Sequence, residues 1–212
     1  MKLYYSPGAC SLAAHVALRE AERSFELVRV DLHTKRLATG EDYRVINPKH
    51  KVPALVLDGP GSDVLTENPA VLSYIADLVP EKRLAPIAGT FGRYHMIEML
   101  SFIATEVHKQ FGLLWHPETP SPVQERQRGK IGEALLYLQD VLHDRAFLFG
   151  ETFTIADCYM LPMLRWCERF GMGLQIWPNL DDYYLRMVER PTVQAALAAE
   201  GLLAAPRMKR IA

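Results

Sequence analysis

Residues 1–12 read MKLYYSPGACSL, and they determine the fold of the first part of the chain. Residues 2–5 are short, aromatic and apolar, which predicts a buried strand. Residues 6–9 have the composition of a turn, and the apolar positions in residues 10–22 fit one face of a helix. Residues 25–30 alternate and predict a second strand. A strand, a helix and a strand in this order predict a parallel unit.

A third strand is predicted at residues 52–57, with a proline at its head, where proline is tolerated. Residues 58–63 are a strong turn signal, so the chain returns at Val64-Leu65 as a hairpin. Asn68-Pro69 then predicts a helix start, with asparagine as the N-cap and proline at the first helical position, running to about residue 79. A polar stretch over residues 31–40 and a short helix over residues 41–46 fill the interval before the third strand.

Strand patterns stop near residue 80, and everything later has helical periodicity. We expect an α/β domain over residues 1–80, a linker over residues 81–88 and an all-helical domain over residues 89–212. The helices are predicted at residues 90–115, 122–143, 155–169, 179–189 and 192–201.

Composition excludes several classes of protein. The chain has 212 residues, 49% hydrophobic and 23% charged, with a net charge of -1, so it is neither disordered nor attracted as a whole to nucleic acid or an anionic membrane. The three cysteines are too few for a disulfide scaffold and indicate a reducing compartment. The uncharged residues 3–18 are interrupted by Ser6-Pro7-Gly8, which argues against a signal peptide. No apolar run is long enough to span a bilayer, and we expect a cytoplasmic protein.

Cys10 is the first candidate for chemistry. It lies at the predicted start of a helix, where unpaired N–H groups and the helix dipole lower the pKa of a thiol. The alternative is a small buried side chain without a chemical role. Cys158 and Cys167 lie in apolar helical sequence and are interpreted as core residues.

Two loop motifs are candidates for binding. Val52-Pro53 precedes a strand, and a cis bond there would expose the Val52 backbone to an extended ligand, although the trans isomer is the commoner one. Glu67-Asn68 stands at a helix start, where N–H groups attract an anion and the Glu67 carboxylate suits an amine. The alternative for this motif is an ordinary capped helix.

Ser101, Thr105 and His108 are spaced by four and three residues, which predicts one helical stripe with either a binding or a purely structural role. Tyr159 and Trp166, seven residues apart, either belong to the core or line an apolar pocket at the domain junction.

Thr154 and Asp157 have the spacing of a capping box, with aspartate in place of the commoner glutamate. We therefore interpret Asp157 as structural.

Together these pieces resemble the glutathione S-transferase family, and the bacterial beta class in particular. The resemblance covers nearly the whole chain. The segments that carry it are residues 1–12, Asn47-Pro48 with residues 51–55, residues 65–67 with 74–76, residues 103–109, the capping box, residues 178–180 and residues 190–193.

The resemblance implies a thioredoxin-like N-terminal domain, an all-helical C-terminal domain, a glutathione site between them and a homodimer. It implies that Cys10 contacts the glutathione sulfur or forms a mixed disulfide with it, and that Val52 pairs with the cysteinyl part beside a cis Pro53. Glu67 and Asn68 would hold the γ-glutamyl end, and Lys35 the glycyl end. The remaining residues implied at the site are Ser101, Thr105 and His108 from the helical domain, Tyr5 as an alternative sulfur partner beside Ser11, and Tyr159 and Trp166 in the electrophile pocket.

The function implied is conjugation of the glutathione thiol to small hydrophobic electrophiles, as in detoxification, with Cys10 and His108 as catalytic residues. Glutathione is then a co-substrate, and we expect no resident cofactor or metal. A glutathione-dependent thiol-disulfide reductase or peroxidase using Cys10 is the first alternative. The second is a non-catalytic ligand carrier, because fold does not fix function.

Overall fold

The computed structural model describes residues 1–59 and 63–203. The expected parallel unit at the N-terminus is confirmed. Strand β1 (Lys2–Tyr5) is followed by helix α1 (Leu12–Glu20) and strand β2 (Glu26–Asp31). β1 and β2 pair in parallel, with Lys2 opposite Glu26.

The described strands form a five-stranded sheet in the order β3-β2-β1-β4-β5. Strand β4 (Ala54–Val56) and strand β5 (Val64–Thr66) pair antiparallel, as the hairpin pattern predicts. The turn expected at residues 58–63 includes residues 60–62, which lie outside the described part of the chain. Strand β3 (Arg36–Leu37) has two residues within the polar stretch, too short to leave a pattern in the sequence.

Helix α2 (Asn68–Asp77) corrects one prediction about the chain. The N-cap is Glu67 rather than Asn68, and Asn68 is the first helical residue, followed by Pro69. The short helix expected at residues 41–46 is only a 3-10 turn, Tyr43–Val45, and a second 3-10 turn, Pro80–Lys82, follows α2.

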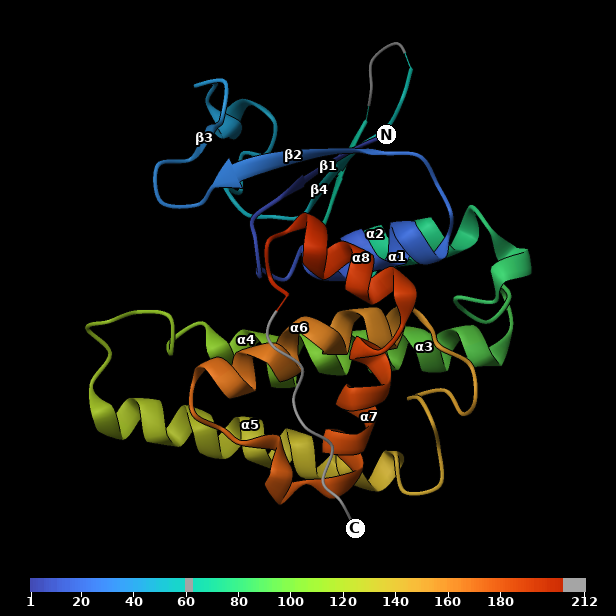
Figure 1. Cartoon of the computed structure of the whole chain (residues 1–212), viewed down its shortest axis with the longest axis vertical. Helices are drawn as coiled ribbons and strands as arrows, with labels where there is room; N and C mark the ends of the chain where they lie inside the picture. The colour runs from blue at the N-terminus through green and yellow to red at the C-terminus, as the bar shows by residue number, and fades with distance from the viewer. Residues whose placement is uncertain (60–62, 204–212) are drawn as a thin grey trace.

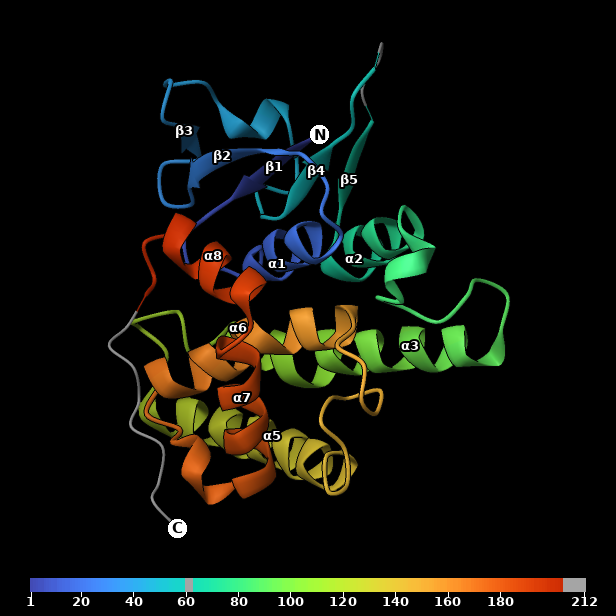
Figure 2. The same ribbon diagram turned by 45° about the vertical axis from the view of Figure 1, so that its right-hand side comes forward.

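All further helices follow the expected linker. They are α3 (Phe91–Phe102), a π-helical turn (Ile103–His108), α4 (Lys109–Phe111), α5 (Ser121–Val141), α6 (Ile155–Arg169), a 3-10 turn (Leu174–Ile176), α7 (Pro178–Val188) and α8 (Pro191–Ala199). Helices α1, α2 and α8 lie between the sheet and the remaining helices, and both views show α8 returning from the C-terminal unit to lie beside α1 (Figures 1 and 2). Within the described ranges, no helix is both long and apolar enough to cross a membrane.

The capping box at the start of α6 is present. The buried Asp157 carboxylate accepts hydrogen bonds from the Thr154 N–H at 2.7 Å, the Leu148 N–H at 3.0 Å and the Tyr183 hydroxyl at 2.7 Å. Burial raises the pKa of Asp157, which these donors oppose. The predicted structural role of Asp157 fits this geometry, because each of its bonds ties the helix start to the surrounding core. Cys158 and Cys167 are fully buried, as expected.

Candidate active site

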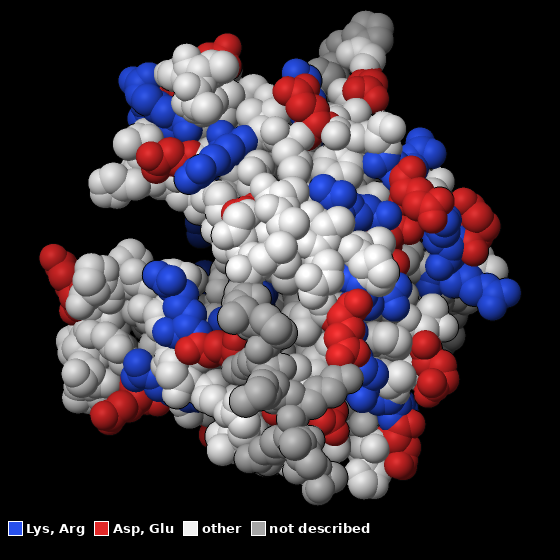
Figure 3. All heavy atoms as spheres, viewed as in Figure 1, with Lys and Arg blue, Asp and Glu red and all other residues white. Residues whose placement is uncertain are grey.

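A cleft lies between the N-terminal unit and the helical unit. It comprises two adjoining hollows of about 390 and 720 Å³, and Cys10, Val52, His108 and Trp166 line both. Figure 3 shows the surface hollowed between the two units, with Lys and Arg side chains gathered over the β2–β3 side of the opening. A small ligand in this cleft would touch both units.

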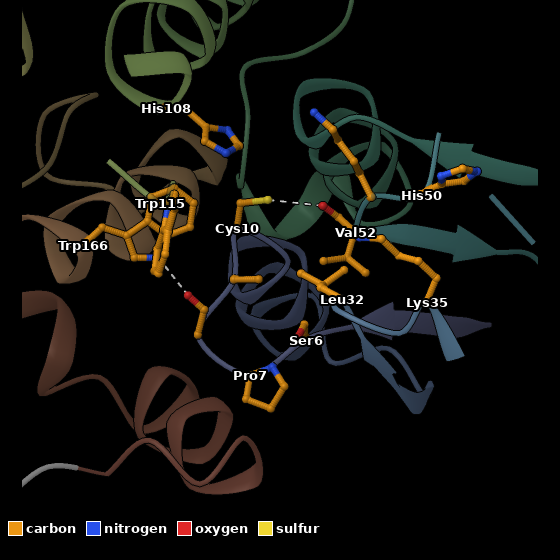
Figure 4. A pocket seen from close by; sticks show the side chains of 13 residues that line it. Ser6, Pro7, Cys10, Leu32, Lys35, His50, Val52, His108, Trp115 and Trp166 are labelled. Carbon is orange, nitrogen blue, oxygen red and sulfur yellow. Dashed lines mark hydrogen bonds between the residues drawn. The ribbon is translucent and has the colours of Figure 1, made fainter. Parts of the chain in front are cut away.

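The Cys10 side chain points into the cleft from the turn that precedes α1 (Figure 4). Its Sγ donates a hydrogen bond to the carbonyl oxygen of Val52 at 3.2 Å. Burial raises the pKa of the Cys10 thiol to about 12. The expectation of a lowered pKa is therefore wrong. The physical reason is burial, which favours the uncharged thiol, and α1 begins only at Leu12, so Cys10 precedes the first helical turn.

The bond between Val52 and Pro53 is cis. Two side chains hold the segment before it, because the Tyr43 hydroxyl and the Asn47 amide both donate to the carbonyl oxygen of Lys51, at 2.8 and 2.7 Å. The segment therefore presents the Val52 backbone at the cleft wall in a fixed position.

Glu67 and Asn68 line the larger hollow and not the smaller one. Glu67 has a left-handed backbone with φ of 71°, and its carboxylate pairs with the Lys49 ammonium at 2.7 Å. The buried Asn68 amide donates to the carbonyl oxygen of Cys10 at 3.1 Å, whereas its Oδ1 has no hydrogen-bond partner within the described residues. Asn68 thus links the helix start to the Cys10 turn and keeps one acceptor unused.

His108 and Tyr159 meet in the larger hollow, where His108 Nδ1 and the Tyr159 hydroxyl share a hydrogen bond of 2.8 Å. Burial lowers the pKa of His108 to about 4, with a smaller contribution from the Lys51 cation. Burial also raises the pKa of Tyr159. Near neutral pH both groups are therefore uncharged, and they act through hydrogen bonds.

Ser101 and Thr105 do not share a face with His108. Both are exposed, line neither hollow and donate to backbone carbonyls one turn back in their own helix. The single stripe was predicted for a regular α-helix. The π-helical turn Ile103–His108 widens the spiral and turns His108 away from that stripe.

Tyr5 and Ser11 lie outside the cleft as well. Tyr5 is 8% exposed, and its ring packs in the core near that of His15. Ser11 is fully buried and bonds to the Ser6 backbone. Neither geometry suits a sulfur partner. Lys35 does line the smaller hollow, together with His50.

Trp166 and Trp115 form the aromatic wall of the cleft (Figure 4). Their ring centroids lie 5.3 Å apart at 84°. Trp166 Nε1 donates to the carbonyl oxygen of Gly8 at 2.8 Å, and the Arg169 guanidinium lies 5.0 Å from the Trp115 ring centroid. The sequence interpretation missed Trp115. Trp115 was the last residue of the helix predicted at residues 90–115, whereas α4 ends at Phe111 and Trp115 lies in the loop that follows.

Comparison with known proteins agrees with this arrangement. The family model for the glutathione S-transferase N-terminal domain matches residues 1–77, and that for the C-terminal domain matches residues 94–191. Glutathione S-transferase GstA of Escherichia coli O157:H7 is 45% identical over 202 residues, which cover 95% of this chain and 100% of that protein.

Two solved structures are similar throughout. A bacterial beta class glutathione S-transferase from Sphingomonas chungbukensis is 45% identical with a TM-score of 0.91, and a sphingomonad glutathione S-transferase complexed with glutathione is 43% identical with a TM-score of 0.91. Each alignment covers 96% of this chain and 100% of the other. The chain therefore belongs to the glutathione S-transferase family, with a thioredoxin-like N-terminal domain and a helical C-terminal domain.

Proposed function

We propose that this protein binds glutathione in the cleft and conjugates its thiol to small hydrophobic electrophiles. The observation that carries the proposal is the position of the Cys10 thiol. It lies beside the Val52 backbone that would pair with the cysteinyl part of glutathione, and it faces an aromatic wall on the helical unit. The two substrates of a conjugation would therefore meet at one point.

Glutathione fits the cleft by charge. The Glu67 carboxylate suits the γ-glutamyl ammonium, and the unused Asn68 Oδ1 offers a second acceptor for it. Lys35, which lines the smaller hollow and not the larger one, suits the glycyl carboxylate. A peptide that reaches from one hollow into the other past Val52 would be extended, which is the form that pairs with a backbone edge.

Cys10 and His108 would act on the sulfur by hydrogen bonding. A protonated Cys10 donates its S–H to the glutathione thiolate in place of the Val52 carbonyl. If the Tyr159 hydroxyl donates to His108 Nδ1, the ring proton resides on Nε2, which becomes a second donor. Donors fixed before the reaction stabilise the anion without reorganisation, and the thiol proton leaves to solvent.

The conjugation step needs no resident cofactor. The thiolate attacks the electrophilic carbon held against Trp166, Trp115 and Tyr159, a carbon–sulfur bond forms, and a leaving group such as halide departs with the bonding electrons. The protein contributes alignment of the two reactants.

The raised pKa of Cys10 favours conjugation over thiol-disulfide exchange, because exchange needs a thiolate on Cys10. The test compares Cys10→Ala and Cys10→Ser with the parent chain, measuring conjugation to an aromatic halide and the mass of the protein after incubation with oxidised glutathione. We expect Cys10→Ser to retain more conjugation than Cys10→Ala, because serine keeps a donor, and no glutathionyl adduct on the parent. An adduct on Cys10 together with reductase activity lost in both variants would favour the reductase.

We also propose a homodimer. Three apolar side chains of α3, Phe91, Tyr94 and Ile97, are 76%, 61% and 46% exposed and recur every third residue, so they share one face. An exposed apolar face of this kind is typical of an interface between copies of one chain. Sedimentation velocity tests the proposal, with Tyr94→Glu expected to give monomers and Tyr137→Glu, on α5, as a comparison.

A cytoplasmic location and a role in detoxification are part of the same proposal. The sparse, unpaired cysteines support a reducing compartment. Fractionation of the source cells with an antibody against the chain tests the location.

A further inference from the structure

A buried chain of hydrogen bonds runs from the end of α8 to the turn that carries Cys10. The Glu200 side chain, fully buried, accepts the backbone N–H of Gly8 at Oε2, 2.9 Å away. Its Oε1 lies 2.8 Å from His15 Nδ1. On the far side of the ring, His15 Nε2 accepts from Arg19 Nε at 2.9 Å. Glu200, His15 and Arg19 line neither hollow of the cleft, whereas Gly8 lines the smaller one.

The chain has a defined direction. Arg19 Nε only donates, so His15 Nε2 must accept, and the ring proton must reside on Nδ1. His15 therefore donates to Glu200 as an uncharged imidazole, and Glu200 must be an acceptor at both oxygens. A carboxylate meets this requirement, and an amide of the same shape does not.

The same chain reaches the aromatic wall through Gly8. While Glu200 holds the N–H of Gly8, the carbonyl oxygen of Gly8 accepts from Trp166 Nε1 at 2.8 Å. Gly8 has φ of 70°, and a side chain added there would touch Leu202 at 3.6 Å. The turn is thus held from both sides, and it lines the smaller hollow.

We propose that Glu200 and His15 are positioning residues, which fix the Gly8 turn and through it the placement of Trp166 against the electrophile. This inference rests on the proposed function, because Trp166 matters only if an electrophile binds beside it. The glutathione contacts at Val52 and Glu67 come from other segments. Cys10, two residues after Gly8, is also held by the Val52 carbonyl and the Asn68 amide, so the main effect falls on the electrophile.

A purely structural role is the competing explanation, because Glu200 also holds α8 to α1. The chain offers a matched control for it. Glu20 on α1 is bonded by Arg190 at 2.8 and 2.9 Å at the start of α8, in the same pair of helices but without a bond to Gly8. Glu20→Gln therefore weakens the contact between α1 and α8 and leaves the turn intact.

The main variant is Glu200→Gln. When the new amide oxygen accepts from Gly8, the amide N–H₂ faces His15 Nδ1–H, and two donors oppose each other. His15 escapes by moving its proton to Nε2, where it then opposes Arg19 Nε–H. Arg19→Gln removes this conflict, because the glutamine oxygen occupies the position of Nε. The double variant Arg19→Gln/Glu200→Gln thus reverses the two bonds made by the His15 ring, and the amide oxygen at position 200 remains available to accept from the Gly8 N–H.

Two measurements separate the effect of the variants on the Gly8 turn from their effect on the reaction. Amide exchange of Gly8, measured by NMR, needs no turnover, so it remains informative even if the proposed function fails. We expect exchange to rise at least tenfold in Glu200→Gln and to return within threefold of the parent in the double variant. The KM for an aromatic halide should rise about tenfold and recover in parallel, with glutathione affinity within twofold throughout.

Three results would overturn the proposal. The first is a Gly8 amide that exchanges in Glu200→Gln at the parent rate. The second is a KM that rises equally in Glu20→Gln, since this variant shares only the structural role. The third is a ¹⁵N spectrum of the parent that places the His15 proton on Nε2. If Glu200→Gln does not fold, the double variant and the ¹⁵N spectrum still decide the question.

Discussion

The sulfur of Cys10 lies 3.2 Å from the carbonyl oxygen of Val52, the residue before the cis proline. The thiol is therefore a hydrogen-bond donor in the free protein, with a pKa raised by burial to about 12. The Val52 backbone, which would bind the cysteinyl part of glutathione, accepts the hydrogen bond of the Cys10 thiol in the free protein. Substrate binding must exchange one acceptor of the Cys10 proton for another.

The first prediction concerns the reactivity of Cys10. Because alkylation requires the thiolate, we expect iodoacetamide to modify Cys10 at pH 8 at least tenfold more slowly than it modifies free glutathione. The rate should rise steadily with pH through pH 10, since the pKa of about 12 lies above this range. Peptide mass spectrometry separates Cys10 from the buried Cys158 and Cys167. A rate that levels off near pH 7 contradicts the raised pKa.

A second prediction concerns stability in acid. The pKa of His108 is lowered to about 4 from 6.5, so between these values the unfolded chain holds a proton that the folded protein does not. The stability that this difference supplies is complete above pH 6.5 and is lost as the pH falls toward 4. Between pH 7.5 and 4.5, we expect the unfolding free energy of the parent to fall by about 2–3 kcal/mol more than that of His108→Gln.

Urea unfolding at both pH values measures this loss. His95→Gln is the control, because His95 is exposed and its hydrogen-bond partner among the described residues is Glu98 on its own helix. If His108→Gln and the parent lose equal stability in acid, His108 is not buried in its uncharged form.

A third prediction uses the ion pair of Glu67 with Lys49. Glu67→Gln should weaken binding of S-methylglutathione about tenfold, or ~1.4 kcal/mol, because the ligand ammonium loses its carboxylate. Lys49→Met should act in the opposite direction, by about twofold to threefold, because it frees the carboxylate from an exposed pair. Calorimetric titration measures both, and the Lys49 effect should shrink in 0.5 M salt. Weaker binding in Lys49→Met would place Lys49, not Glu67, against the ligand.

The fourth prediction concerns the start of α6. Thr154→Ala should cost ~0.5–2 kcal/mol of unfolding free energy, as the loss of a cap does. Asp157→Ala should cost more, about 3 kcal/mol or above, because it leaves the Leu148 and Thr154 N–H groups and the Tyr183 hydroxyl unpaired in the core. Denaturant unfolding gives both values. Equal losses of unfolding free energy in the two variants would show that Asp157 contributes no more than an ordinary helix cap.

Local physical chemistry explains why much of the fold could be predicted. Residues 1–31 form the expected parallel unit because apolar alternation, turn residues and helical periodicity occur in the right order. The capping box and the core placement of Cys158 follow from spacing alone. The cis bond at Pro53 was implied only by the resemblance, since no local rule selects it.

The errors occur where distant contacts decide. Asn68 was expected to cap its own helix, but its amide bonds to the Cys10 carbonyl 58 residues away in sequence, and Glu67 takes the N-cap position. Ser101 and Thr105 were expected beside His108, but a π-helical turn separates their faces.

The amino-acid sequence by itself determined the two kinds of unit, the order of their elements and the position of the one cysteine outside the helical core, because these depend on periodicity and turn chemistry. Only the tertiary structure decided the state of that cysteine. Its pKa is raised by burial, and its thiol donates to the Val52 carbonyl 42 residues away in sequence, and neither of these is visible along a single stretch of chain. The bond from the Gly8 N–H to the Glu200 side chain was also decided by the tertiary structure, because only folding brings together two residues 192 positions apart.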